Sequence, residues 1–496
     1  MVASLLKLIS SGVQDERLYF GPTLYPFIKV WVKAGRFTTQ WGRLDFENVP
    51  AFGNTAFFRI LRKGHLVTRL FLVAKMPDIY TPQKAAKEIS ANYYPTFGWT
   101  NSLGHALVEN LTLDIAASRV ETIDSRLLEI LDEYNTPLEK VPIVNELIKR
   151  KDNGFTQTSF GHPPIETSNG YNETVIVPLP FWFSRGDNAC ALPIDAISAD
   201  EVRVGITFRN LNGLYYTDTH VQNTSSDQGT SLSPLVGSLF YQPGQIPIPV
   251  PPMPNLQLGE CYILAEYVYL DQNEANQFRL GDLQVPIVQH YAMSPYQTED
   301  LQMARIPLDI PNPTRDIFFM LNRKEAPSYN AHFLATRDLT GNINTLPNGS
   351  KTPWWPDALG LYANRPSILR PGFTLSDSEP LQAFQLTYQG LVRCRTEAPP
   401  LFRSILPSYE QRKTPWVNRY YYNIPLGIQN GYTPFSRPMG EANLDKMTKR
   451  ELVLQMRHKR EYIGGTVVPS YTVYAYAETY NILRVYGGRA GLLFAY

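Results

Sequence analysis

The chain has 496 residues, of which 43% are hydrophobic and 18% are charged, and its formal net charge is +1. This length favours roughly two to four domains, and the apolar fraction excludes an intrinsically disordered chain. The near-neutral balance argues against wrapping nucleic acid, which needs a strong positive field. We therefore expect no direct nucleic-acid binding, and we interpret the basic residues between 446 and 460 as a solvated face or a subunit contact.

Tyrosine and proline stand out in the composition, with 30 Tyr and 40 Pro. Aromatic side chains favour pleated, half-buried surfaces, whereas Pro ends strands and stiffens loops. The mixture predicts a mainly β protein with long ordered connections and few helices.

Cysteine usage and the N-terminal segment bear on the compartment. The three cysteines, Cys190, Cys261 and Cys394, are odd in number and far apart, so we expect a reducing compartment and no disulfide framework. The first 18 residues contain only a short apolar patch, which makes a poor secretory signal. No apolar run reaches the length of about 18 residues that a membrane-spanning helix needs. We therefore expect a soluble protein or a part of a soluble assembly.

Strand-like segments follow one another along most of the chain. The clearest is 201–211, where Val202, Val204 and Ile206 alternate with mostly polar side chains, as in a half-buried antiparallel strand. The other predicted strands are 69–77, 107–116, 175–183, 262–270, 316–321, 381–392, 419–426, 451–456 and 473–486.

Two amphipathic helices interrupt this pattern. Residues 122–134 place three leucines on one face, with Asp124 or Ser125 available as the N-cap. Residues 142–151 form the second helix, with basic residues in its last turn, where the helix dipole favours positive charge. We expect both helices to lie in loops of a β-sandwich.

A proline-rich segment at 242–254 divides the chain. It contains six prolines and predicts a stiff, extended connector, because each Pro restricts φ and removes a backbone donor. Strand-like segments lie on both sides of it. The pattern therefore indicates two β units of roughly 200 residues each, joined by this linker.

The C-terminal segment 473–496 predicts a strand that is covered on both faces. Tyrosines at 474, 476, 480 and 486 fall on one face, and small or aliphatic side chains fall on the other. The apolar run that ends the chain, with Leu492, Leu493 and Phe494, is interpreted as a buried anchor.

Motifs for catalysis or cofactor binding are missing from the sequence. It has no nucleophile elbow, and NGSKT at 348–352 lacks the glycine before Lys351 that a phosphate loop needs. The seven histidines do not have spacings that converge on a metal, and His105 is interpreted as an internally hydrogen-bonded core histidine. We therefore expect no cofactor, no metal and no enzymatic activity.

Two further features leave a second class of function open. Trp354 and Trp355 predict either the aromatic platform of a carbohydrate-binding or carbohydrate-cleaving β-sandwich, or a pair buried at a subunit contact. Sequons make Asn172, Asn223 and Asn348 candidate glycan acceptors.

Several strings, taken together and in order, carry a resemblance to a known family. They are LLKLISSGVQDERL (5–18), PTLYPFIKVWVKAGRFT (22–38), RILRKGHLVTRLFLVAKMP (59–77), GWTNSLGHALVENLTLDIAASRVETIDSRLLEILDEY (98–134), VPLPFWFSRGDNACALPIDAISADEVRVGITF (177–208), LAEYVYLD (264–271), YYYNIPLGIQNGYTPFSRPMGEANLDKM (420–447) and YAYAETYNILRVYGGRAGLLFAY (474–496). With them the chain resembles the major capsid proteins of nucleocytoplasmic large DNA viruses. It departs from the family pattern at His65, at Asp200 and in RPMGEANLDK (437–446).

The resemblance implies a mainly β fold of two tandem antiparallel eight-stranded jelly-roll sandwiches with short helices in the loops. It divides the chain into an N-terminal arm with a short helix (1–25), a first jelly roll (26–241), the proline-rich linker (242–255) and a second jelly roll (256–496). The glycine pair near the C-terminus is then a turn or bulge beside the closing strand. The structural motif residues that it implies are Gly104, His105, Leu179, Pro180, Phe181, Trp182, Gly487 and Gly488.

The same resemblance implies a structural major capsid protein. Its members are expected to form homotrimeric, pseudo-hexagonal capsomers that tile the icosahedral shell of a large double-stranded DNA virus. The implied partners are other copies of the chain, neighbouring capsomers, and minor capsid and penton proteins, with only indirect contact to an inner viral membrane. The implied location is the virion, after assembly in the host cytoplasm.

Overall fold

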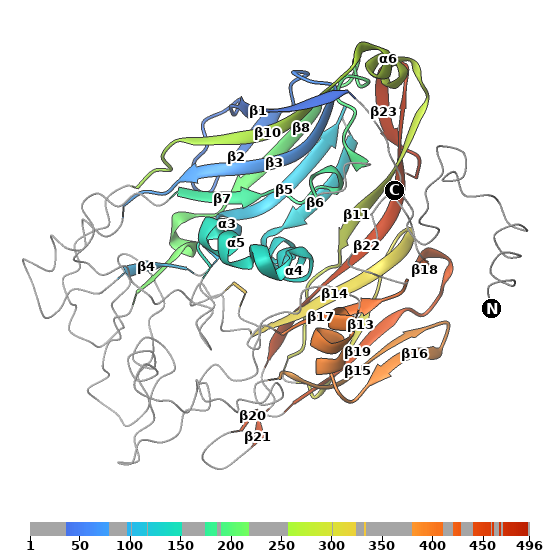
Figure 1. The fold of residues 1–496 in the computed structure, drawn as a ribbon. Helices are drawn as coiled ribbons and strands as arrows, with labels where there is room; N and C mark the ends of the chain where they lie inside the picture. The colour runs from blue at the N-terminus through green and yellow to red at the C-terminus, as the bar shows by residue number, and fades with distance from the viewer. Residues whose placement is uncertain are drawn as a thin grey trace, which may run out of the picture.

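The computed structural model describes residues 36–78, 97–100, 102–116, 118–150, 174–185, 190–217, 256–299, 301–323, 332–333, 379–409, 420–427, 440–457, 459–460, 466–467 and 470–494. Within these ranges antiparallel strands form two sandwiches that lie side by side (Figure 1). None of the helices in them is long and apolar enough to cross a membrane.

The first sandwich packs two four-stranded sheets face to face. Alternation places one side chain in two toward the shared core, as in β8, where Val202, Val204, Ile206 and Phe208 are buried while Arg203 is partly exposed. One sheet has the order β1 (Phe37–Leu44), β10 (Cys261–Leu270), β3 (Leu66–Lys75), β7 (Thr174–Pro178), and the other β2 (Thr55–Arg59), β8 (Val202–Phe208), β5 (Val108–Ile115), β6 (Ser118–Asp124).

The second sandwich also has two sheets. The larger has the order β11 (Leu283–Ala292), β22 (Tyr471–Tyr486), β14 (Pro313–Arg323), β17 (Tyr421–Pro425), and the smaller β13 (Met303–Pro307), β19 (Glu451–Met456), β15 (Leu381–Tyr388), β16 (Leu391–Thr396). The short strands β12 (Tyr296–Gln297), β18 (Ala442–Asn443) and β23 (Arg489–Leu492) extend the larger sheet, and two separate pairs are β4 (Phe97–Trp99) with β9 (Tyr215–Thr217) and β20 (Lys459–Arg460) with β21 (Thr466–Val467).

The two sandwiches share one topology. When the eight main strands of each are numbered in chain order, their sheets have the orders 1-8-3-6 and 2-7-4-5 in both cases. This is the strand order of a jelly roll, in which the chain crosses repeatedly between the two sheets and its last strand returns beside its first. The predicted fold class, two tandem eight-stranded jelly rolls, is confirmed.

The place where the first jelly roll ends differs from the prediction. Strand β10 follows the proline-rich segment, in the range predicted to form the second jelly roll, but Ala265 of β10 lies opposite Gly42 of β1 and Leu70 of β3. The segment 242–255, outside the described residues, therefore precedes the last strand of the first sandwich and is not the linker between sandwiches. Helix α6 (Gln272–Leu280) follows β10 and leads into the second sandwich.

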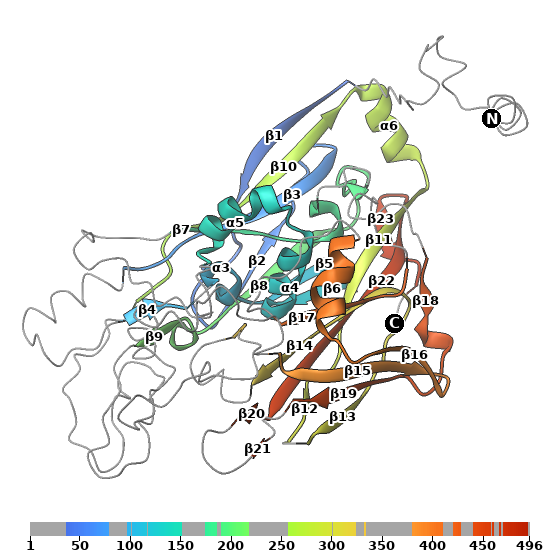
Figure 2. The same cartoon turned by 60° about the horizontal axis from the view of Figure 1, so that its bottom comes forward.

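The two predicted helices are confirmed, with shifted ends. Helix α4 (Ser125–Asn135) begins after β6, and the Asp124 side chain accepts from Leu127 N at 2.7 Å as its N-cap. Helix α5 (Val141–Ile148) ends at Lys149, whose left-handed φ of 56° stops it. The expected basic last turn is wrong, because Arg150 lies beyond the helix and is buried. Figure 2 shows α4, α5 and the short α3 (Leu103–Leu107) gathered in the loops of the first sandwich.

Other helical segments are short. Single turns lie at Leu138–Lys140, Trp182–Ser184, Leu211–Gly213 and Leu444–Lys446, and a wider turn at Leu401–Ile405 runs into α8 (Leu406–Tyr409).

Three expectations about strands are wrong. The single strand predicted at 381–392 is a hairpin of β15 and β16, turned at Gln389 and Gly390, both of which have positive φ. The strand predicted at 175–183 ends at Pro178. In β22 both faces are buried only near its centre, since Arg484 and Tyr486 are exposed at its end.

The apolar C-terminal run is not a buried anchor either. Leu493 is 47% exposed and Phe494 is 50% exposed.

We predict that Trp182→Ala lowers the free energy of unfolding by about 3–5 kcal/mol, because a large side chain leaves a cavity. Trp182 is fully buried and its ring meets Phe183 edge-on at 5.2 Å between centroids. Chemical denaturation of the purified protein measures the change. The control Ile143→Ala removes a side chain that is 63% exposed and should change stability by less than about 0.5 kcal/mol. Equal stability of the two variants would contradict the prediction.

Candidate functional site at the junction of the two sandwiches

The two jelly rolls meet where β6 of the first lies beside β11 of the second (Figure 1). We call this contact and the side chains that bridge it the junction. The buried side chain of Gln289 on β11 donates from Nε2 to the Val120 carbonyl on β6 at 2.5 Å. The Asn481 amide on β22 in turn donates to Gln289 Oε1 at 2.8 Å. A glutamine held on both sides thus joins the two sheets.

Four charged or titratable side chains form a buried cluster at the junction, which we call the Arg185 cluster: Arg185, Glu121, His290 and Glu478. Arg185 Nη1 lies 2.6 Å from Glu478 Oε1, so an arginine of the first sandwich pairs with a glutamate of the second. His290 Nδ1 lies 2.6 Å from Glu121 Oε1, a pair that crosses the junction in the other direction. All four side chains are at most 4% exposed. Buried charges this close must remain paired, because an isolated charge in the interior costs several kcal/mol.

The contacts of His290 define its tautomer. Arg185 Nη2 is a donor and contacts His290 Nε2, which must therefore accept. The other ring nitrogen, Nδ1, is then the one that carries the proton, which it donates to Glu121. The His290 ring thus links the arginine to the glutamate.

Asp124 connects a helix of the first sandwich with the long strand of the second. One carboxylate oxygen caps α4, and the other accepts from the Tyr476 hydroxyl of β22 at 2.7 Å. Burial, with the adjacent Asp124 charge, raises the pKa of Tyr476 well above its ordinary value, so this hydroxyl remains a donor. Beside it, the Arg126 guanidinium lies 4.0 Å from the centre of the Tyr474 ring.

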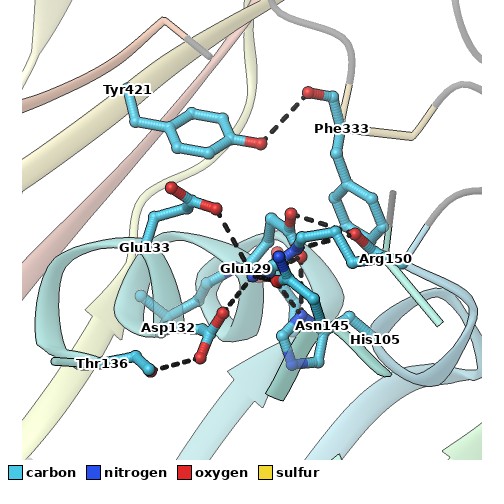
Figure 3. A network of polar contacts seen from close by, with 12 residues as sticks. His105, Glu129, Asp132, Glu133, Thr136, Asn145, Arg150, Phe333 and Tyr421 are labelled. Atoms are coloured by element: carbon cyan, nitrogen blue, oxygen red, sulfur yellow. Dashed lines mark hydrogen bonds and ion pairs between the residues drawn. The ribbon is translucent and has the colours of Figure 1, made fainter. Parts of the chain in front are cut away.

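A second buried network, the Arg150 cluster, supports the helices next to the junction (Figure 3). Arg150 lies between three carboxylates of α4, with Nη2 at 2.6 Å from Glu129, Nη1 at 3.4 Å from Glu133, and a closer contact to Asp132. Burial opposes the guanidinium charge, but Glu129, Asp132 and Glu133 outweigh it and raise the pKa of Arg150 well above its ordinary value. Arg150 lies just after α5, so its ion pairs link the end of α5 to α4.

The Arg150 cluster reaches the second sandwich through tyrosines. The Tyr134 hydroxyl of α4 donates to the Tyr421 carbonyl on β17 at 2.7 Å, and its ring lies 5.6 Å from that of Phe318 on β14. The Tyr421 hydroxyl donates to the Phe333 carbonyl at 3.1 Å. Helix α4 is thus bonded to the second sandwich at both ends.

The glycine pair at the C-terminus forms another contact of the junction. Gly487 and Gly488, with φ of 58° and 81°, form the two-residue turn between β22 and β23. The Gly488 carbonyl accepts from Ala199 N of the first sandwich at 2.8 Å, and Asp200 accepts from Ala490 N at 2.9 Å. A Cβ on Gly488 would lie 2.3 Å from Ser198 Oγ, so a larger residue at this position would require the Ser198 side chain to move.

The structure places the other motif residues in the supports of these networks. His105, buried in α3, contacts Glu129 through Nδ1 at 2.6 Å, and its neighbour Gly104 leaves room for Val177 and Ile148. The segment with Leu179, Pro180, Phe181 and Trp182 is buried except for Pro180, whose carbonyl accepts from Arg185 Nε at 3.0 Å. The Pro180 carbonyl therefore helps to orient the Arg185 side chain toward Glu478 of the second sandwich.

Sequence reasoning missed the bridging residues themselves. Glu121, Glu478 and His290 stand inside apolar strand segments, which is the one signal that could have identified them, because an ionisable residue there must find a partner. Asn172, Asn223, Asn348, Trp354 and Trp355 lie outside the described residues.

The arrangement is suited to holding the two sandwiches in one orientation. Among the residues with described positions, no group of three or more His, Cys, Asp or Glu is placed to hold a metal ion. The buried charges are instead used in pairs and networks that cross from one sandwich to the other or brace the helices beside the contact.

We predict that Arg150→Met destabilises the protein by about 3–5 kcal/mol, because it leaves buried carboxylates without their cation. The control is Lys149→Met, which removes a neighbouring lysine paired with the exposed Glu146 and should cost less than about 1 kcal/mol. Denaturant titration at neutral pH measures both. An Arg150 variant as stable as the control would show that the cluster does not depend on this charge.

We predict that Gly488→Ala is more destabilising than Gly487→Ala. Both residues have positive φ and share a backbone penalty of about 1–2 kcal/mol, but a Cβ on Gly487 meets nothing within 4 Å. The added contact with Ser198 should cost Gly488→Ala about 1–3 kcal/mol more. The second change Ser198→Gly should recover much of the difference. Thermal unfolding measures this series, and equal midpoints for the two single variants would contradict the docking contact.

Two family models match the chain in succession. "Major capsid protein N-terminus" matches residues 27–271 and "Large eukaryotic DNA virus major capsid protein" matches residues 280–491. The interval between them falls at α6, where the first sandwich ends. Together the two matches cover nearly the whole chain.

Individual relatives are also capsid proteins. The chain is 23% identical to probable capsid protein 4 of Acanthamoeba polyphaga mimivirus over 218 residues, which is 43% of this chain and 39% of that protein. It is 20% identical to the major capsid protein of Invertebrate iridescent virus 3 over 498 residues, which is 97% of this chain and 94% of that protein. Against several curated relatives, the mimivirus protein included, the match spans less than half of the relative's length.

The fold is similar to that of a chain in the quasi-atomic model of the PBCV-1 virus capsid. The TM-score is 0.65 at 16% identity, and the match covers 95% of this chain and 100% of that one. The chain belongs to the major capsid protein family of large eukaryotic DNA viruses, whose members are structural proteins of the capsid and not enzymes.

Proposed function

We propose that this major capsid protein forms a homotrimer whose outline is pseudo-hexagonal, and that these capsomers tile an icosahedral shell. The observation that carries the proposal is the repeated strand order, 1-8-3-6 with 2-7-4-5, in both halves of one chain. A threefold axis acting on two similar sandwiches produces six similar sandwiches in a ring. Such a ring presents similar edges in six directions, which is what a hexagonal lattice requires.

The junction supports this proposal mechanically. The six sandwiches of a trimer can present similar edges only if the two sandwiches of each chain keep a constant relative orientation. Arg185 with Glu478 and Tyr134 with the Tyr421 carbonyl bridge the two sandwiches with short, buried bonds. A rigid double unit loses little conformational freedom when it binds a neighbour, so more of the contact energy is available for assembly.

Exposed apolar side chains supply surface for contacts between copies. Phe37 and Trp41 on the edge strand β1 are 64% and 52% exposed, and Leu391 and Val392 on the edge strand β16 are also more than half exposed. Unpaired edges with exposed apolar side chains are sites where another chain can add. With a net charge of only +1, copies of this chain repel one another weakly.

Neighbouring capsomers and the minor capsid and penton proteins are the further partners that we propose, with assembly in the host cytoplasm before incorporation into the virion. Family membership supports these assignments. The low net charge supports the absence of direct nucleic-acid binding, and contact with an inner membrane is proposed to be indirect. No observation on the described residues favours the carbohydrate-binding alternative.

We predict that the purified protein is a trimer. Three copies of a 56.3 kDa chain have a mass of about 169 kDa, and native mass spectrometry or light scattering measures it directly. Class averages of the same sample in the electron microscope should show a six-lobed outline. A monomer at every concentration and within isolated particles would refute the proposal, and a trimer with only three lobes would refute the pseudo-hexagonal arrangement.

A further inference from the structure

Two buried histidines of the second sandwich contact the first, and each has an arginine beside it. His290 on β11 belongs to the Arg185 cluster. His332 follows β14 and is 6% exposed. Their shared position at the junction suggests a role in controlling it.

His290 has no room for a second proton in the closed junction. The charged groups that face it are Glu121 from β6, Glu478 from β22 and Arg185 from the segment after Trp182–Ser184. Its Nε2 accepts from Arg185, so a proton added there would place two donors and two positive charges against each other. Glu478 Oε1, at 3.8 Å from Nε2, can accept that proton's hydrogen bond only after Arg185 moves. The displaced arginine would then lose its bonded place between the sandwiches.

His332 is also held by hydrogen bonds to both sandwiches. Its Nε2 donates to the Gly213 carbonyl of the first sandwich at 2.8 Å, and Asn322 Nδ2 donates to the His332 carbonyl at 2.8 Å. The charged side chains that act on it are Arg209, which follows β8, and Arg126 of α4. Both are positive, so protonating the ring would add a third positive charge.

We propose that the junction is an acid-sensitive latch: protonation of His290 and His332 in mildly acidic solution loosens the contact between the two sandwiches while each sandwich stays folded. The bond that protonation disrupts, from Arg185 to His290, crosses the junction. At His332 the bond to the Gly213 carbonyl can persist, and the added positive charge instead repels Arg209 and Arg126 of the first sandwich. The β-sheet ladders of each sandwich use backbone groups that do not titrate. The latch is a property of one chain and does not depend on the trimer.

The direction of the pH effect follows from the two states of His332. Burial, together with the charges of Arg209 and Arg126, lowers the pKa of His332 from 6.5 to about 3 in the closed junction. In the open junction the ring reaches water and titrates near its ordinary value. Below about pH 6.5 the open form therefore binds a proton that the closed form does not, and the closed form loses stability progressively as pH falls toward 3.

Hydrogen exchange of the full-length protein tests the latch. We expect the amides of β6 and β11 to lose at least tenfold in protection between pH 7.5 and pH 5.5, after correction for intrinsic exchange rates. The amides of β3 and β19, which lie inside the separate sandwiches, should stay within about twofold. Native mass measured in the same buffers reports any change of oligomeric state separately. Unchanged protection in β6 and β11 would overturn the proposal.

Histidine variants identify the sensor. The double variant His290→Gln, His332→Gln should abolish the dependence of β6 and β11 protection on pH. The control His65→Gln changes a histidine that accepts from Leu270 N at 2.8 Å within the first sandwich, and it should keep the wild-type response. A double variant that responds to pH like the wild type would overturn the proposal.

A measurement on the unaltered protein covers the case in which the double variant fails to fold. Exchange of the imidazole C2 hydrogen, read by mass spectrometry, titrates each histidine separately. We expect His290 and His332 to become protonated over the same pH range in which β6 and β11 lose protection. Loss of protection while both rings stay neutral would overturn the latch.

Discussion

The pairing of buried charges across the junction is the constraint on which the arrangement of this protein depends. Arg185 pairs with Glu478, and His290 links Arg185 to Glu121, all with little or no access to water. Each of these groups would be costly to bury alone, so the position of every partner is defined by the others. Hydrophobic contact alone would hold the sandwiches together, but it would tolerate sliding. Directional bonds between charged groups define one orientation.

Features that seem unrelated in the sequence serve this constraint. The segment from Leu179 to Trp182 anchors the backbone whose carbonyl orients Arg185. The Arg150 cluster stiffens α4, which carries Tyr134 to the second sandwich. The turn at Gly487 and Gly488 brings the end of the chain against Ser198. A capsid protein has no reaction to catalyse, and the geometry that these contacts maintain is instead the relation between two similar sandwiches. That relation is what a shell built from repeated contacts requires.

Local patterns predicted the elements well where the physics is local. Alternation identified β8 because its inward and outward side chains face core and solvent, and Asp124 was correctly named as a candidate cap of α4. The hairpin at Gln389 and Gly390 was missed because strand-forming residues lie close on both sides of the short turn. The prolines of 242–254 predict a stiff segment, but stiffness does not reveal which sheet the next strand joins. The prediction therefore placed β10 in the second sandwich, whereas it belongs to the first.

By itself, the sequence determined that this protein is mainly β, that it has two units, and, through its ordered motifs, which family it resembles. These properties depend on side-chain periodicity and on neighbours within a few residues. The tertiary structure alone decided that β10 closes the first jelly roll, and that Arg185, Glu121, His290 and Glu478 form one cluster although they span more than 350 positions. The reason is physical: pairing of strands and of buried charges is set by proximity in space, and no local preference of the chain encodes the partner.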